Sequence, residues 1–150
     1  MSPLERAISL ASSAHAGQVD EAGQPYILQP VRVMLRMTGD IERIAAVLHD
    51  IVEDTPLTLE QLLAEGFSVA VVEAVAALTK LPGESRMRAA VRAATNPLAR
   101  AVKLADNAES MDLSRISSPT AKDFARIEEY KAVRELLLAT DAASQETPSK

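Results

Sequence analysis

The segment that most constrains the expected architecture is Ile44-Ala45-Ala46-Val47-Leu48-His49-Asp50-Ile51-Val52-Glu53-Asp54-Thr55-Pro56. It opens with an apolar run and closes with a proline, whose ring cannot continue a helix. The pattern therefore predicts a helix that begins near Ile41, after the candidate cap Asp40, and ends before Pro56. The apolar run also indicates that the last turn of this helix is at least partly buried.

Three carboxylates and one imidazole crowd that last turn. His49 stands four residues before Glu53, and Asp50 stands four residues before Asp54. In a continuous helix each pair would lie along one face. The helix dipole disfavours negative charge at this end by roughly 0.3–1 kcal/mol per group, and buried carboxylates usually pair with cations or coordinate metal ions. The stretch alone leaves two interpretations open, a divalent metal site or solvated acids around a frayed helix end.

Composition limits the class of protein and of partner. The chain has 150 residues, of which 47% are hydrophobic and 25% charged, which fits one globular domain with a sizeable core. Aromatic residues make up only 3%, so the core must consist of Ala, Leu, Val and Ile. A net charge of −5 without a basic cluster argues against a nucleic-acid polymer as partner. A small anionic substrate fits, because a bound cation can invert the local field.

The sequence also bears on compartment and on metal ligands. There is no cysteine, which excludes disulfides and thiolate ligands. No apolar run approaches the roughly 20 residues that span a bilayer, and the N-terminus lacks the basic-then-apolar order of a signal peptide. We therefore expect a cytoplasmic location and no membrane partner.

Apolar residues at helical spacing predict a single all-α domain over residues 1–140, with about seven or eight helices. Residues 141–150 are polar, and we expect them to form a disordered tail. Arg86, Arg88 and Arg92 are expected to form a solvated face. His15 is expected to be a hydrogen-bonded histidine of the core or one that supports a metal ligand, rather than a metal ligand itself. Besides the central helix and a short helix after Pro30, the expected helices are 3–16, 58–65, 68–78, 85–94, 97 to beyond 106, and 121–139.

Four motifs occur in order along the chain: Ala14-His15-x-Gly17-Gln18, Gly23-x-Pro25-Tyr26-Ile27-x-x-Pro30, Leu48-His49-Asp50-x-Val52-Glu53-Asp54-Thr55 and Val102-Lys103-Leu104-Ala105-Asp106. Together they resemble the HD-superfamily metal-dependent phosphohydrolases. The nearest branch comprises small stand-alone hydrolases similar to the hydrolase domain of RelA/SpoT proteins. The resemblance covers residues 4–138, nearly the whole predicted domain.

The resemblance implies an all-helical HD domain that binds one divalent ion, manganese in the family. It assigns the ion to His49, Asp50 and Asp106, and it assigns orientation or deprotonation of the attacking water to Glu53 and Asp54. The implied reaction is hydrolysis of a phosphoester of a nucleotide. In the family, the reaction removes the 3′-pyrophosphate from guanosine tetra- or pentaphosphate. The ion would lower the pKa of its water and polarise the phosphoryl oxygen.

Three positions depart from the family pattern. Gln29 replaces the first metal-binding histidine, and an amide oxygen is a weaker, neutral ligand for transition metals. We therefore expect the ion to bind weakly or to be absent. Asp20-Glu21 replaces a basic pair that grips the nucleotide, so these acids would repel a polyphosphate. Ser110 replaces an asparagine and is a candidate substrate contact, as is Lys80.

Two hypotheses about function follow from this pattern. The first is a working metal-dependent phosphohydrolase that acts on a nucleotide or another small phosphoester. It is favoured because the resemblance retains both acids of the Glu53-Asp54 pair and three of the four ion ligands. The alternative is a catalytically weakened relative that serves as a nucleotide-binding or regulatory module, which Gln29 and the acidic loop favour.

Overall fold

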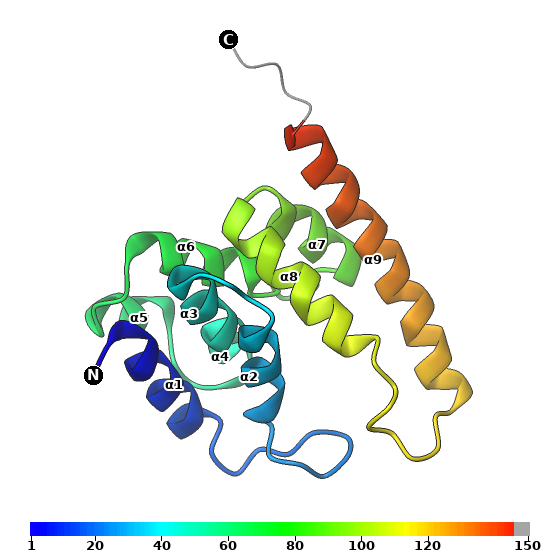
Figure 1. The fold of residues 1–150 in the computed structure, drawn as a ribbon, viewed down its shortest axis with the longest axis horizontal. Coiled ribbons are helices and arrows are strands. Elements are labelled where there is room, and N and C mark those ends of the chain that lie inside the picture. Colours follow the sequence, from blue (N-terminus) through cyan, green and yellow to red (C-terminus); the bar gives the residue numbers. More distant parts are fainter. Residues whose placement is uncertain (146–150) are drawn as a thin grey trace.

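The computed structural model describes the backbone of residues 1–145 and the side chains of residues 1–140. The described chain is all-α, as predicted, and its residues form nine helical segments (Figure 1). These segments are α1 (Pro3–Ala14), α2 (Leu28–Leu35), α3 (Asp40–Leu48), α4 (Ile51–Asp54), α5 (Leu59–Ala64), α6 (Val69–Leu78), α7 (Arg86–Ala94), α8 (Pro97–Ser110) and α9 (Ala121–Gln145).

Local capping explains where several of these helices begin. The Thr58 hydroxyl oxygen accepts a hydrogen bond from the backbone amide of Gln61, and Gln61 Oε1 accepts one from the backbone amide of Thr58, which is the predicted capping box. The side chain of Asn96 caps α8, and Pro97 occupies the first helical position, where its missing N–H costs nothing. The valine-rich segment at α6 forms a helix, and its cap is Ser68. The capping signals in the sequence therefore located these boundaries.

The prediction of one continuous central helix is wrong, because the chain divides into α3 and α4 at His49 and Asp50. In a continuous helix the carbonyl of Ala46 would accept the amide of Asp50. Here that carbonyl accepts the backbone amide of His49 at 3.3 Å and the His49 ring Nδ1 at 2.6 Å. The predicted cap is also shifted by one residue. Gly39 caps α3, and its amide donates to the Glu42 carboxylate at 2.8 Å.

Helix α3 lies at the centre of the fold and packs against α1, α2, α6 and α8. Every residue from Ile44 to Leu48 is buried. The core around it consists almost entirely of Ala, Val, Leu and Ile, as the low aromatic content predicts. None of the helices formed by the described residues has the length and apolar content of a membrane span.

Helix α9 packs along α7 and α8 at one side of the molecule (Figure 1). It extends to Gln145, so the first five residues of the expected polar tail continue the helix. Residues 146–150, the remainder of that tail, lie outside the described residues.

The expected solvated arginine face on α7 is wrong for two of its three residues. Arg92 donates to the carbonyls of Ala76, Ala77 and Thr79 at the end of α6 and forms an ion pair with Glu84. The guanidinium of Arg86 lies 4.5 Å from the centre of the Tyr130 ring on α9. Both side chains therefore join α7 to neighbouring elements, which a helical charge pattern does not reveal.

Candidate functional site

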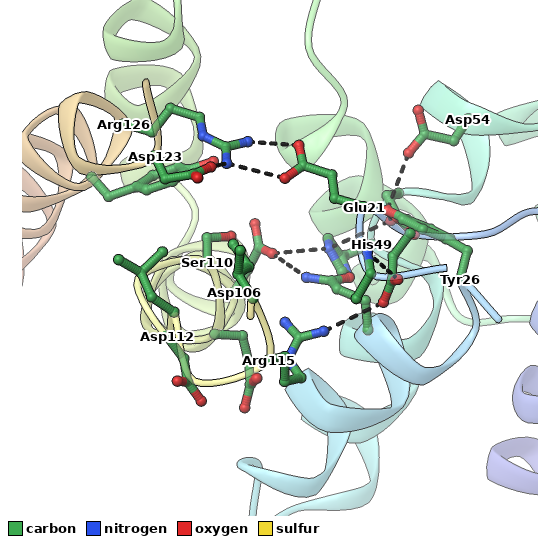
Figure 2. A pocket seen from close by; sticks show the side chains of 18 of the residues that line it. Glu21, Tyr26, His49, Asp54, Asp106, Ser110, Asp112, Arg115, Asp123 and Arg126 are labelled. Carbon is green, nitrogen blue, oxygen red and sulfur yellow. Dashed lines mark hydrogen bonds and ion pairs between the residues drawn. The ribbon is translucent and has the colours of Figure 1, made fainter. Parts of the chain in front are cut away.

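A pocket of about 330 Å³ opens where the α3–α4 junction faces α8 and the beginning of α9 (Figure 2). Six of the predicted metal-binding and catalytic residues line it, and so does Ser110; the six are Gln29, His49, Asp50, Glu53, Asp54 and Asp106. The Lys80 side chain instead lines an adjoining cavity of about 240 Å³. The two cavities share Asp106 and Ser110 in their walls. The structure therefore brings the predicted residues together, with Lys80 at the periphery.

The break in the central helix fixes the orientation of the His49 ring. A carbonyl oxygen only accepts hydrogen bonds, so Nδ1 carries the proton that is donated to Ala46. The other ring nitrogen, Nε2, faces the carboxylates, at 3.5 Å from Asp106 Oδ1 and 3.9 Å from Asp50 Oδ2. Asp106 belongs to α8, so two separate segments meet at this imidazole.

The electrostatics of this group are strongly coupled. Burial opposes the charged imidazolium, but Asp50 and Asp106 outweigh burial and raise the pKa of His49 to about 9. Burial likewise opposes the charged carboxylates, but His49 outweighs it and lowers the pKa of both Asp50 and Asp106. These opposite shifts favour an imidazolium at His49 beside the two carboxylates.

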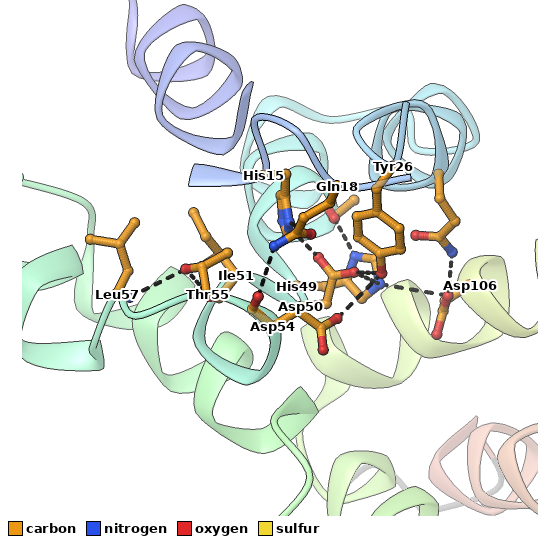
Figure 3. Close-up of polar contacts among 12 residues, drawn as sticks. His15, Gln18, Tyr26, His49, Asp50, Ile51, Asp54, Thr55, Leu57 and Asp106 are labelled. Carbon is orange, nitrogen blue, oxygen red and sulfur yellow. Dashed lines mark hydrogen bonds and ion pairs between the residues drawn. The ribbon is translucent and has the colours of Figure 1, made fainter. Parts of the chain in front are cut away.

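Asp50 is held by a network that begins in α1 and the following loop (Figure 3). The Tyr26 hydroxyl donates to Asp50 Oδ2, and His15 Nε2 lies 3.4 Å from Asp50 Oδ1. Gln18 lies 2.9 Å from His15 Nδ1 through Oε1, and its Nε2 donates to the backbone carbonyl of Asp54. His15 is buried, which confirms it as a hydrogen-bonded core histidine.

Asp106 is held by polar contacts from two directions. Gln29 Nε2 donates to Asp106 Oδ1 at 2.8 Å, and Lys103 Nζ lies 3.7 Å from Asp106 Oδ2. The other amide atom, Gln29 Oε1, is buried and has no hydrogen-bond partner among the described residues. The Gln29 side chain thus occupies one Asp106 oxygen with its N–H and leaves its own oxygen without a hydrogen bond among the described residues.

The two acids of α4 have different surroundings. Because the central helix is broken at His49 and Asp50, His49 and Glu53 do not share a face of one continuous helix. Glu53 Oε1 accepts the backbone amide of Lys80 at 2.7 Å. Asp54 Oδ2 lies 3.4 Å from the Tyr26 hydroxyl. Partial burial, together with the charges of Asp50 and Glu53, raises the pKa of Asp54. Asp54 therefore takes up a proton more readily than an ordinary aspartate does.

Ion binding requires ligand atoms of suitable type and spacing. Two ligands that are each about 2.1 Å from one ion lie at most about 4.2 Å apart, and the 3.5 and 3.9 Å separations from His49 Nε2 meet this limit. Within the described part of the chain, however, no group of three His, Cys, Asp or Glu side chains is already gathered as a complete ion site. The three side chains therefore fit an ion in chemistry, and His49 Nε2 fits it in its spacing from each of the two carboxylates.

Sequence reasoning assigned no role to Tyr26, Gln18, Arg115 or Arg126. Tyr26 and Gln18 belong to the quoted motifs, so a signal for them was present in the sequence. Arg115 and Arg126 belong to none of the quoted motifs. They nevertheless line the pocket and form ion pairs with the acids of residues 20–21. These acids are therefore partly neutralised, which the sequence pattern did not predict.

Comparison with known proteins relates the chain to several (p)ppGpp enzymes. It is 46% identical over 88 residues to guanosine-3′,5′-bis(diphosphate) 3′-pyrophosphohydrolase of Haemophilus influenzae, covering 55% of this chain and 13% of that protein. It is 46% identical over 86 residues to bifunctional (p)ppGpp synthase/hydrolase SpoT of Escherichia coli K12, covering 52% and 12%. It is 34% identical over 132 residues to a probable GTP pyrophosphokinase of Mycobacterium leprae, covering 79% and 17%. The chain thus spans less than a fifth of each of these relatives.

A solved structure and a family model agree with this relation. The fold resembles that of a metazoan ortholog of SpoT that hydrolyzes ppGpp, with a TM-score of 0.74 and 22% identity, over 93% of this chain and 85% of that chain. Residues 7–105 match the family model of the HD domain, which is more than half of the chain. The chain therefore belongs to the HD domain family.

Proposed function

We propose that this chain is a metal-dependent phosphohydrolase that resembles guanosine-3′,5′-bis(diphosphate) 3′-pyrophosphohydrolases and acts on a nucleotide or another small phosphoester. HD-domain hydrolases depend on a divalent metal ion. The names of the relatives support a nucleotide as the substrate class. The pocket supports a small substrate, because its volume of about 330 Å³ lies in the range of ligand sites.

One observation carries the proposal. His49 and Asp106, which are 57 positions apart in the sequence, meet within 3.5 Å, and Asp50 stands beside them. His49, Asp50 and Asp106 would hold the ion, with Gln29 as a weaker fourth ligand through Oε1. The mixed imidazole and carboxylate set suits manganese. The bond from His49 Nδ1 to Ala46 would keep Nε2 directed at the ion.

The remaining residues would act on water and substrate. The bound ion would supply a water of lowered pKa and a polarised phosphoryl oxygen. Asp54 would accept the proton of the attacking water, which its raised pKa favours, and Glu53 would orient that water. Ser110 and Lys80 would contact the substrate, and Lys80 would do so from the adjoining cavity.

A manganese-supplemented screen for released phosphate and pyrophosphate tests the proposal. It would compare guanosine tetraphosphate with nucleoside mono-, di- and triphosphates. We expect release from at least one nucleotide, and Asp50→Ala should abolish both release and metal retention. Asp40→Ala, an exposed position at the start of α3, is the matched control and should leave both unchanged. Release that persists in Asp50→Ala, or none from any nucleotide, would contradict the proposal.

A second candidate is a catalytically weakened binding or regulatory module. The observation that favours it is the hydrogen bond from Gln29 Nε2 to Asp106 Oδ1, because it occupies an oxygen that the ion would need. If this hydrogen bond is what weakens ion binding, Gln29→His should raise the metal affinity and the rate of hydrolysis by about tenfold or more. Unchanged metal content and rate in this variant would show that Gln29 is not what limits the site.

A further inference from the structure

Two ion pairs at the rim of the pocket join parts of the chain that are far apart in sequence. Arg126 Nη1 and Nη2 donate to the two carboxylate oxygens of Glu21 at 2.7 and 3.0 Å. Arg115 Nη1 lies 3.4 Å from Asp20 Oδ2. All four side chains line the same pocket, with Glu21 and Arg126 joined across it in Figure 2. We call these contacts, Asp20–Arg115 and Glu21–Arg126, the rim ion pairs.

The two acids of the rim ion pairs, Asp20 and Glu21, belong to a turn that hydrogen bonds to the backbone stabilise. Asp20 Oδ1 accepts the backbone amides of Ala22 and Gln24, both at 2.9 Å. Gly23 adopts a φ of +79°, a conformation that residues with a Cβ rarely adopt. Asp20 therefore uses one oxygen to shape the turn and the other to bind Arg115, and the turn holds Glu21 at the rim.

The basic side consists of Arg115 and Arg126, whose guanidinium groups can bind an anion. Arginine presents a planar fork that matches phosphate in geometry and charge. Here each fork faces a carboxylate, and Arg126 also donates to Asp123 on its own helix. The pairs are partly exposed, with 30% of the Arg126 side chain and 69% of the Glu21 side chain accessible. Because exposed ion pairs are individually weak, a multiply charged anion can compete with the carboxylates.

We propose that Asp20 and Glu21 set the anion selectivity of the pocket by holding Arg115 and Arg126. A phosphate-bearing compound must displace the two carboxylates before it reaches the arginines. A compound with two adjacent phosphate groups carries more negative charge than a single phosphate and therefore competes more strongly with the two carboxylates. This inference deepens the proposed function, on which it rests for the assignment of the pocket as the substrate site.

The test measures binding of inorganic pyrophosphate by isothermal titration calorimetry, with EDTA present so that no divalent ion contributes. The test variant is Asp20→Asn/Glu21→Gln, in which Asn retains the oxygen that shapes the turn. The matched control is Glu60→Gln/Glu73→Gln, which removes two negative charges at exposed positions on α5 and α6. A third variant adds Arg115→Gln/Arg126→Gln to the test variant. Circular dichroism confirms that each variant is folded.

We expect the test variant to bind pyrophosphate about fivefold more tightly or better than the wild type. The control should change affinity by less than about twofold, because distant surface charges are screened. Removal of both arginines should abolish the gain. The proposal is overturned if there is no gain, if the control gains equally, or if the gain survives without the arginines. Because this readout requires neither metal nor turnover, its failure is distinguishable from failure of the hydrolase proposal.

Discussion

At the residue scale, His49 links the fold to the chemistry. Its ring Nδ1 donates a hydrogen bond to the Ala46 carbonyl at the break in the central helix. This hydrogen bond directs Nε2 toward Asp50 and Asp106. The sequence could predict that these three residues belong together, because the motifs carry them in order. It could not predict the helix break, since a continuous helix and a broken one have the same apolar pattern here. Nor could it predict the partners of Asp20 and Glu21, because pairing across 95 and 105 positions leaves no local signal.

The raised pKa of His49 predicts how metal affinity depends on pH. The pKa of about 9 means that the ring is protonated at neutral pH, and an ion must displace the Nε2 proton to bind. Manganese affinity should therefore rise about tenfold per unit between about pH 6 and pH 8, with about one proton released per ion. Calorimetry in buffers of different ionisation enthalpy measures both quantities. A flat affinity profile without proton release would contradict the prediction that the ion binds by displacing a proton from His49.

At the element scale, capping and helical spacing predicted most helices, but the contacts between helices were not visible in the sequence. The Arg92 side chain on α7 closes the end of α6 by donating to the Thr79 carbonyl at 2.6 Å. The segment that follows α6 includes Lys80, whose amide holds Glu53. One arginine on α7 thus supports a loop that contacts a candidate catalytic acid.

We predict that Arg92→Met destabilises the protein by about 2 kcal/mol, because it removes charged hydrogen bonds and leaves carbonyl groups at the end of α6 unpaired. Urea unfolding gives the free energy. The same substitution at the exposed Arg88 on α7 is the control and should change stability by less than about 0.5 kcal/mol. Equal effects of the two substitutions would mean that the Arg92 contacts contribute nothing specific.

At the scale of the whole molecule, the ion ligands and the last helix belong to different parts of the structure. The proposed ligands lie on α2, the α3–α4 junction and α8, which share the main core. Helix α9 attaches through a smaller cluster that includes Val133 and Leu137. The composition predicted an aliphatic core, but only the structure shows that α9 has a separate apolar contact. Stability and ion binding should therefore be separable.

Leu137→Ala tests this separation. Leu137 is fully buried, so its truncation should cost roughly 2–5 kcal/mol of unfolding free energy. Manganese affinity should stay unchanged at a temperature where the variant is folded, because α9 supplies none of the proposed ligands. Leu138→Ala, at a neighbouring position that is 45% exposed, is the control and should have little effect on stability. A loss of ion binding in folded Leu137→Ala would contradict the separation.

In the proposed function, His49, Asp50 and Asp106 form a site for one divalent ion. The most direct measurement is the stoichiometry of manganese bound to the purified chain at equilibrium, compared between wild type and Asp106→Asn. We expect about one ion per wild-type chain and an affinity more than about tenfold lower in the variant. No binding to the wild-type chain at about millimolar manganese, or equal binding to both proteins, would contradict the proposed site.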